Sequence, residues 1–132
     1  MRGFVLDASL ALEWFTVGAT PESRAKRALL DERVALVPHL WRFEIMNVLS
    51  LWQRRKVTSR AQATAILQDL MAIPFAVVDE GAPEMIVSLA VSHGLSAYDA
   101  TYLQVAILSE QPLATLDRQL LKAAKSVGVE CL

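Results

Sequence analysis

Cysteine is nearly absent from this 132-residue sequence, in which Cys131 stands alone. A single cysteine cannot form an internal disulfide, and its place in an apolar C-terminal segment favours a small buried side chain. Glycine is also scarce, with five residues, and none of them belongs to a glycine-rich phosphate loop. These absences exclude a disulfide scaffold, a cysteine-rich metal cluster and a glycine-rich nucleotide loop.

Long apolar runs are missing as well. Charge or proline interrupts each run well short of the roughly 18 residues needed to cross a bilayer. The N-terminus leads directly into a predicted strand, without a signal-peptide pattern. We therefore expect a cytoplasmic protein with no membrane partner.

The overall charge has no strong sign, since the formal net charge is -1 and the isoelectric point is near 6.1. A nucleic-acid-binding domain is usually basic as a whole, so an RNA or DNA partner would depend on local clusters here. Each candidate cluster is, by itself, typical of a solvated helix face. The clusters are Arg24, Lys26 and Arg27, then Arg54, Arg55 and Lys56, then Arg118, Lys122 and Lys125.

Apolar residues are abundant, at 54%, which is enough for a single domain spanning residues 1–132. Short β-favouring runs predict strands at residues 4–6, 34–37, 75–78, 113–116 and 127–132. Periodicity and capping residues predict helices at 9–18, 20–30, 41–55, 59–73, 83–94, 96–108 and 118–125. Strands that alternate with helices indicate an α/β fold whose parallel sheet is covered on both faces.

Four acidic residues stand out by their positions in this pattern. Asp7 and Asp117 each follow a predicted strand, in FVLD and ATLD, whereas Glu44 and Asp99 lie early in predicted helices. Ligands of open parallel sheets bind beyond the carboxyl ends of the strands. We therefore expect the four carboxylates to converge at that edge of the sheet.

Three of these acids also have a local structural explanation. Asp7 suits a strand-end turn, Asp117 suits the N-cap of the next helix, and Asp99 stands at the capping-box distance from Ser96. Glu44 differs because it lies on an apolar helix face. An unpartnered buried carboxylate is costly, so Glu44 requires a partner or a metal ion.

Four carboxylates crowded together repel one another, and a divalent cation relieves that repulsion. Oxygen-only ligands suit Mg²⁺, with Mn²⁺ as a possible substitute. Such a site hydrolyses phosphodiester bonds by activating a water molecule and neutralising charge on the phosphate. The acids therefore indicate metal-dependent phosphodiester hydrolysis.

Four stretches around these acids resemble the acidic motifs of PIN-domain nucleases, specifically the VapC-type toxins of bacterial toxin-antitoxin pairs. They are FVLDAS, WRFEIMNVL, GLSAYDATYLQVA and LATLDRQLLKAA, and they occur in order over essentially the whole chain. The resemblance implies a three-layer α/β/α sandwich with a mainly parallel sheet. It also implies a Mg²⁺-dependent endoribonuclease that cleaves tRNA or rRNA, forms a homodimer and is held inactive by a VapB-like antitoxin.

The resemblance makes Asp7, Glu44, Asp99 and Asp117 the catalytic and metal-binding acids, with Asp7 and Asp99 as the preferred direct ligands. Three further residues match positions that support such sites, and each has a structural explanation too. Ser9 suits a helix N-cap, Thr115 suits a strand end, and Asn47, one turn after Glu44, is either a carboxylate-orienting or a solvated amide.

Two other functions stay open at this point. A receiver-like phosphoacceptor domain fits the chain length and the alternating pattern, but it needs paired early acids and a late strand-end lysine, which are not evident. A catalytically silent PIN-like binding module is the second alternative. The presence of all four acids argues against it.

Overall fold

The computed structural model describes residues 2–16 and 18–132. Its strands are β1 (Gly3–Leu6), β2 (Val34–Val37), β3 (Phe75–Val77) and β4 (Leu113–Ala114). The α-helices are α1 (Ala8–Glu13), α2 (Pro21–Arg27), α3 (Leu40–Arg54), α4 (Arg60–Ala72), α5 (Pro83–His93), α6 (Ala97–Ser109) and α7 (Arg118–Ser126). A 3-10 turn, Ala28–Asp31, follows α2.

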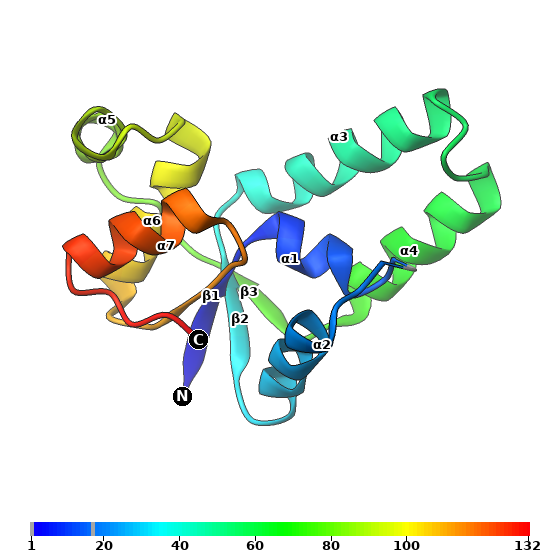
Figure 1. Ribbon diagram of the computed structural model, residues 1–132, viewed down its shortest axis with the longest axis horizontal. Helices are drawn as coiled ribbons and strands as arrows, with labels where there is room; N and C mark the ends of the chain where they lie inside the picture. The colour runs from blue at the N-terminus through cyan, green and yellow to red at the C-terminus, as the bar shows by residue number, and fades with distance from the viewer. Residues whose placement is uncertain (1, 17) are drawn as a thin grey trace.

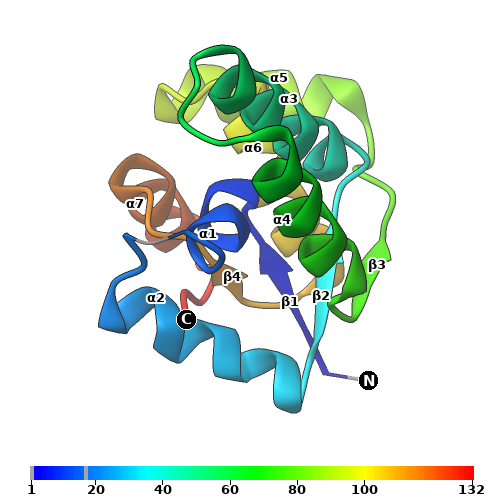
Figure 2. The same cartoon turned by 90° about the vertical axis from the view of Figure 1, so that its right-hand side faces the viewer.

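The four strands form one parallel sheet in the order β3-β2-β1-β4. The central strand β1 pairs with β2 on one side and with β4 on the other, for example Phe4 with Ala35 and Val5 with Leu113. Phe4, Val5 and Leu6 are fully buried, as the uninterrupted apolar run predicts for a strand covered on both faces. Figure 2 shows β1, β2 and β3 side by side.

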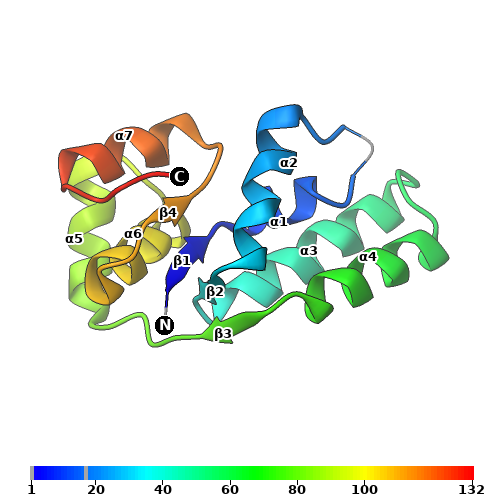
Figure 3. The same cartoon turned by 90° about the horizontal axis from the view of Figure 1, so that it is seen from below.

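Helices cover both faces of the sheet and complete the expected three layers (Figures 1 and 3). On one side lie α5 and α6, and α6 contacts β1, β2 and β4. On the other side α1 packs against α3 and α4, which form a hairpin that projects away from the sheet (Figure 3). The predicted α/β/α sandwich is confirmed.

Helix α6 is the most deeply embedded helix of the fold. Its residues 100–106 are all buried, so it is apolar around most of its circumference. The Ser96 side chain caps its N-terminus by accepting the Asp99 N–H at 3.0 Å. This rigid, capped helix therefore holds its first turn, which carries Asp99, at a defined position beside the sheet.

Several local predictions are confirmed. Thr20 caps α2, Pro83 begins α5, and Gly94 ends α5 with φ +63°, a conformation that glycine adopts without steric cost. The capping box of Ser59 and Gln62 starts α4 with both reciprocal hydrogen bonds present.

Other predictions are wrong in detail. Asp7, rather than Ser9, caps the first helix, which begins at Ala8 and ends at Glu13. The predicted last strand at 127–132 is reduced to an isolated bridge between Leu113 and Cys131. The reason is that α7 continues to Ser126 and is followed by a turn with Gly128 at φ +76°, which leaves too few residues to extend the sheet. The strands β3 and β4 are also shorter than predicted.

None of the helices in the described parts of the chain is long and apolar enough to cross a membrane.

Candidate carboxylate site

The candidate site lies at the edge of the sheet where the parallel strands end. Asp7 directly follows β1, and Asp117 lies three residues after the neighbouring strand β4. Glu44 is in the second turn of α3, which follows β2, and Asp99 is in the first turn of α6. The pairing of β1 with β4 thus places two of the acids on adjacent strand ends.

Asp7 is almost fully buried, with 5% of its surface exposed, and it is well supplied with hydrogen bonds. Its Oδ1 accepts the Ser9 N–H at 3.2 Å, which caps α1. Its Oδ2 accepts the Ser9 hydroxyl at 3.0 Å and the Thr115 hydroxyl at 2.7 Å. Ser9 and Thr115, both predicted as supporting residues, therefore contact the acid directly.

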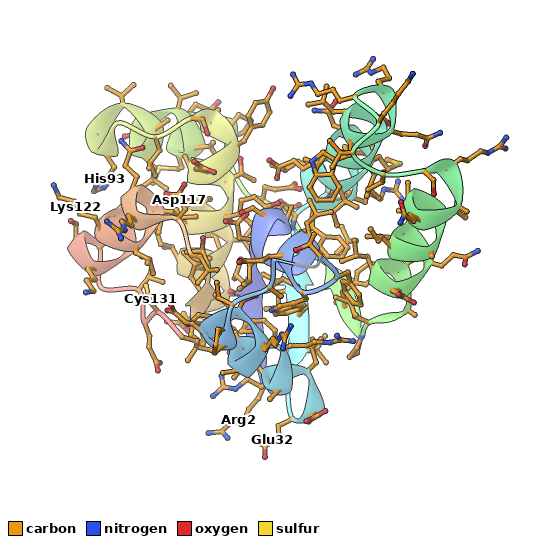
Figure 4. All side chains as sticks on the ribbon, turned by 45° about the vertical axis from the view of Figure 1, so that its right-hand side comes forward. Arg2, Glu32, His93, Asp117, Lys122 and Cys131 are labelled. Carbon is orange, nitrogen blue, oxygen red and sulfur yellow. The ribbon has the colours of Figure 1, made fainter. Side chains whose placement is uncertain are left out.

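Thr115 links two of the acids through one oxygen atom. Its buried hydroxyl donates to Asp7 and accepts the Asp117 N–H at 3.0 Å. The Asp117 carboxylate in turn caps α7 by accepting the Leu120 N–H at 2.8 Å, while its side chain stays exposed. Figure 4 shows Asp117 where the chain enters α7. Asp117 therefore acts as the predicted N-cap and also belongs to the hydrogen-bond chain that reaches Asp7.

The electrostatics show that the four acids share one environment. Partial burial is the largest cause that raises the pKa of Glu44, and the charges of Asp7 and Asp99 raise it further. Partial burial also raises the pKa of Asp99, and the charges of Asp7 and Asp117 add to that effect. Each of the two half-buried carboxylates is thus repelled by two other acids.

Sequence reasoning missed one residue of this site, Tyr102. Its ring is fully buried, and its hydroxyl donates a hydrogen bond of 2.5 Å to Glu44 Oε1. Burial and the charge of Glu44 raise the Tyr102 pKa, so the hydroxyl keeps its proton and remains a donor. The available signal was its spacing, since Tyr102 lies three residues after Asp99 and therefore on the same side of the helix.

Asn47, for which the sequence allows either a carboxylate-orienting or a solvated amide, has the geometry of the solvated one. Its side chain is exposed, and in the described structure it donates no hydrogen bond to the Glu44 carboxylate. Tyr102, from a different helix, supplies that donor instead.

The donor set fits a hard divalent cation held by few protein ligands. No three His, Cys, Asp or Glu side chains among residues 2–16 and 18–132 are close enough together to enclose a metal ion by themselves. Within the same residues, the one ion pair joins His39 and Glu80, so no Lys or Arg neutralises the four acids. Mg²⁺ is commonly held by one or two carboxylates together with waters and substrate phosphate, which suits such an open arrangement.

The fold is a three-layer α/β/α domain with one parallel sheet, and its acids lie at the carboxyl edge of that sheet. In this class of domain, acids at that edge suit cation-dependent chemistry on phosphates. Residues 4–126 match the PIN domain family, and the chain belongs to that family. The family resemblance of the sequence motifs is confirmed at this level.

Solved structures share the fold. PAE2754 from Pyrobaculum aerophilum is 25% identical, with a TM-score of 0.69 over 92% of this chain and 84% of that one. VapBC2 from Rickettsia felis, bound to a DNA fragment from its promoter, is 14% identical, with a TM-score of 0.69 over 98% and 96%. VapC20 of Mycobacterium tuberculosis, described as a sarcin-ricin loop cleaving toxin, is 19% identical, with a TM-score of 0.65 over 92% and 95%. No curated protein matches the chain significantly.

The raised carboxyl pKa values predict how stability depends on pH. A carboxyl group whose pKa is raised by folding binds its proton more tightly in the folded state. The folded state is therefore favoured below the ordinary pKa values of 4.5 for Glu44 and 3.8 for Asp99, and that advantage is lost as pH rises through the raised values. In cation-free buffer, Asp99→Asn should gain thermal stability relative to the parent protein between about pH 4 and pH 7.

Thermal unfolding followed by circular dichroism measures this difference. The matched control for the charge change is Asp69→Asn, which removes an exposed carboxylate of α4 outside the site. A difference between Asp99→Asn and the parent protein that is constant with pH would contradict the electrostatic account.

Proposed function

We propose that this chain is a divalent-cation-dependent endoribonuclease of the VapC toxin type. The observation that carries the proposal is the clustering of Asp7, Glu44, Asp99 and Asp117 at the carboxyl edge of the sheet, where they repel one another and have no basic partner among the described residues. Buried or half-buried repelling carboxylates cost stability, which is typical of a site kept for catalysis.

Each residue of the site has a proposed role. Asp7 and Asp99 are the proposed direct ligands of Mg²⁺, for which Mn²⁺ can substitute, and Glu44 and Asp117 complete the acidic site. Ser9 and Thr115 hold the Asp7 carboxylate in one orientation. When bound, the cation neutralises phosphate charge and lowers the pKa of water for attack on the phosphodiester.

RNA is the proposed substrate, and structured tRNA or rRNA is the proposed class. Support comes from VapC20, a protein of similar fold that is a sarcin-ricin loop cleaving toxin. Basic residues that would contact the phosphate backbone are local rather than global: residues 45–68 contain Arg54, Arg55, Lys56 and Arg60 and no acid. Cleavage of such RNA would take place in the cytoplasm.

Purified protein should cleave tRNA or rRNA in the presence of Mg²⁺ and stop when a chelator is added. Asp7→Asn and Asp99→Asn should each lower the cleavage rate about 100-fold or more, because each removes a proposed ligand charge. Gel analysis of end-labelled RNA measures the rate, and circular dichroism checks folding, which matters for Asp7 because it also caps α1.

Asp69→Asn is the matched control and should cleave at the parent rate. If both site variants retain the parent rate, the proposed site is wrong. If the parent protein binds RNA without cleaving any of it, the silent binding module becomes the better description. The receiver-like alternative is already excluded, because the chain belongs to the PIN domain family.

We also propose a VapB-like antitoxin as the protein partner. The support is a groove of about 650 Å³ between the end of α1 and the α3–α4 hairpin, lined by Phe15, Trp52, Val57 and Ile66 among others. The basic residues at the tip of the hairpin are exposed. In the sequence, Lys56 directly precedes the groove-lining Val57, and Arg60 lies between the groove-lining Thr58 and Gln62. An antitoxin segment with apolar and acidic side chains would complement both features.

On this proposal the neighbouring reading frame encodes a small DNA-binding protein with a partly apolar tail. That protein should bind the chain and stop cleavage. Arg55→Glu combined with Arg60→Glu should weaken the complex about tenfold or more, because two attractions become repulsions. Lys122→Glu is the control, since Lys122 is an exposed cation on α7, far from the hairpin (Figure 4). Calorimetry that gives equal affinities for all three proteins would contradict this groove as the docking site.

A homodimer is the third part of the proposal. Helix α5 is rich in apolar residues, yet none of its described residues is buried. Met85, Val87 and Val91 expose 53%, 58% and 80% of their surfaces. Val87 and Val91, one turn apart, form an exposed apolar pair on one side of α5, which is typical of a protein interface. Glu84 is the one charged residue on that side, and a side with little charge suits a second copy of itself.

Sedimentation velocity should find the parent protein as a dimer. Val91→Lys should shift it towards the monomer, because a lysine on each copy would be desolvated at the interface. Val127→Lys, a similar change at an exposed valine after α7, is the control and should leave the dimer intact. A parent protein that sediments as a monomer at micromolar concentration would contradict the dimer.

A further inference from the structure

The pair formed by Tyr102 and Glu44 crosses the candidate site from one helix to another. Tyr102 belongs to the buried helix α6, and Glu44 belongs to α3. The phenol ring is fully buried, so its hydroxyl has a fixed position, and it donates at 2.5 Å to Glu44 Oε1. In the described structure, Tyr102 is the one hydrogen-bond donor to this carboxylate.

Two effects oppose the position of Glu44 in the site. Its side chain is half-buried and long, and both Asp7 and Asp99 repel it. Releasing a glutamate side chain into water also regains rotamer entropy. The hydrogen bond from Tyr102 opposes both effects, because hydrogen bonds to charged groups are among the strong ones in proteins.

The same contact fixes the relative position of two acids. Asp99 and Tyr102 are three residues apart on α6, so the hydroxyl and the Asp99 carboxylate are carried by one rigid element. Because Tyr102 uses only Oε1 of Glu44, the second carboxylate oxygen stays available to the site. Glu44 is thereby placed relative to Asp99 by the geometry of α6.

We propose that Tyr102 is a positioning residue, whose hydroxyl holds Glu44 among the other carboxylates and so assembles the cation site before substrate arrives. This inference rests on the proposed cation-dependent function. In this proposal Tyr102 touches neither the cation nor the RNA and acts on the site through Glu44.

The probe is Mn²⁺, titrated by calorimetry into the full chain without RNA. Tyr102→Phe keeps the buried ring and removes only the hydroxyl, and it should weaken Mn²⁺ binding roughly tenfold, the effect expected of a group that orients a ligand. The matched control is Tyr98→Phe, which removes the hydroxyl of a tyrosine on the same helix that is 64% exposed, and it should bind Mn²⁺ as the parent protein does.

A double-mutant cycle separates positioning from general packing. In Glu44→Gln, where the acid is gone, adding Tyr102→Phe should change Mn²⁺ affinity no further. A further tenfold loss in that background would mean that Tyr102 acts on the fold and not through Glu44. An affinity of Tyr102→Phe equal to that of the parent protein would also overturn the proposal.

Two further measurements separate a failure of this inference from a failure of the proposed function. Glu44→Asp keeps the charge but shortens the side chain by one methylene, so it should lose Mn²⁺ affinity as Tyr102→Phe does, even if Tyr102→Phe folds poorly. Parent protein and Asp7→Asn report on the function itself. If the parent protein binds no Mn²⁺, the proposed function and this inference both fail. If Asp7→Asn loses Mn²⁺ binding while Tyr102→Phe binds as the parent does, the role of Tyr102 alone is overturned.

Discussion

The hydrogen bond between Thr115 and Asp7 is the interaction on which the site depends. It joins the ends of two adjacent parallel strands, β1 and β4, through side chains that are both almost fully buried. A buried carboxylate needs hydrogen-bond donors, because without them its burial is costly. Asp7 accepts hydrogen bonds from the Thr115 hydroxyl and from the Ser9 N–H and hydroxyl. The same carboxylate caps α1, so the start of that helix and the geometry of the site are set by one side chain.

Near Asp7 lie further acids that form no ion pair with Lys or Arg among the described residues. Glu44 and Asp99 are half-buried and repelled by their neighbours, and burial with that repulsion raises the pKa of each. Local hydrogen bonds offset part of the cost: Tyr102 donates to Glu44, and Ser96 favours the charged form of Asp99. The remaining repulsion is what a divalent cation would relieve, so under the proposed function the cost of the unneutralised acids would also be the source of cation affinity.

Two surfaces outside the site, on the α3–α4 hairpin and on α5, have unusual compositions. The α3–α4 hairpin carries a run of 24 residues, 45–68, with four basic side chains and no acid, in a chain whose formal net charge is -1. Helix α5 presents apolar side chains to solvent. Among the described residues these basic side chains form no ion pair, and the exposed apolar side chains of α5 stay hydrated. Under the proposed function these two surfaces bind the partners, and they lie on different parts of the fold (Figure 1).

The chain order and the local signals determined much of this protein without the structure. Apolar runs ending in Asp7 and near Asp117, together with alternation of strands and helices, were sufficient to predict a parallel sheet with acids at its carboxyl edge. Caps such as Thr20, Ser59 and Ser96 were predictable because their hydrogen bonds span only three residues.

Contacts between distant segments were decided only by the tertiary structure. The structure also decided one local choice, since Ser9 suits the N-cap of α1 but Asp7 takes that role. For Asn47 the sequence allows either an orienting partner of Glu44 or a solvated amide; its side chain is exposed, and the donor to Glu44 is Tyr102, 58 residues after Glu44. The predicted C-terminal strand became a single bridge. Sequence spacing determines which side chains share a helix face or cap a helix, whereas packing decides which faces meet, and so which hydroxyl holds which acid.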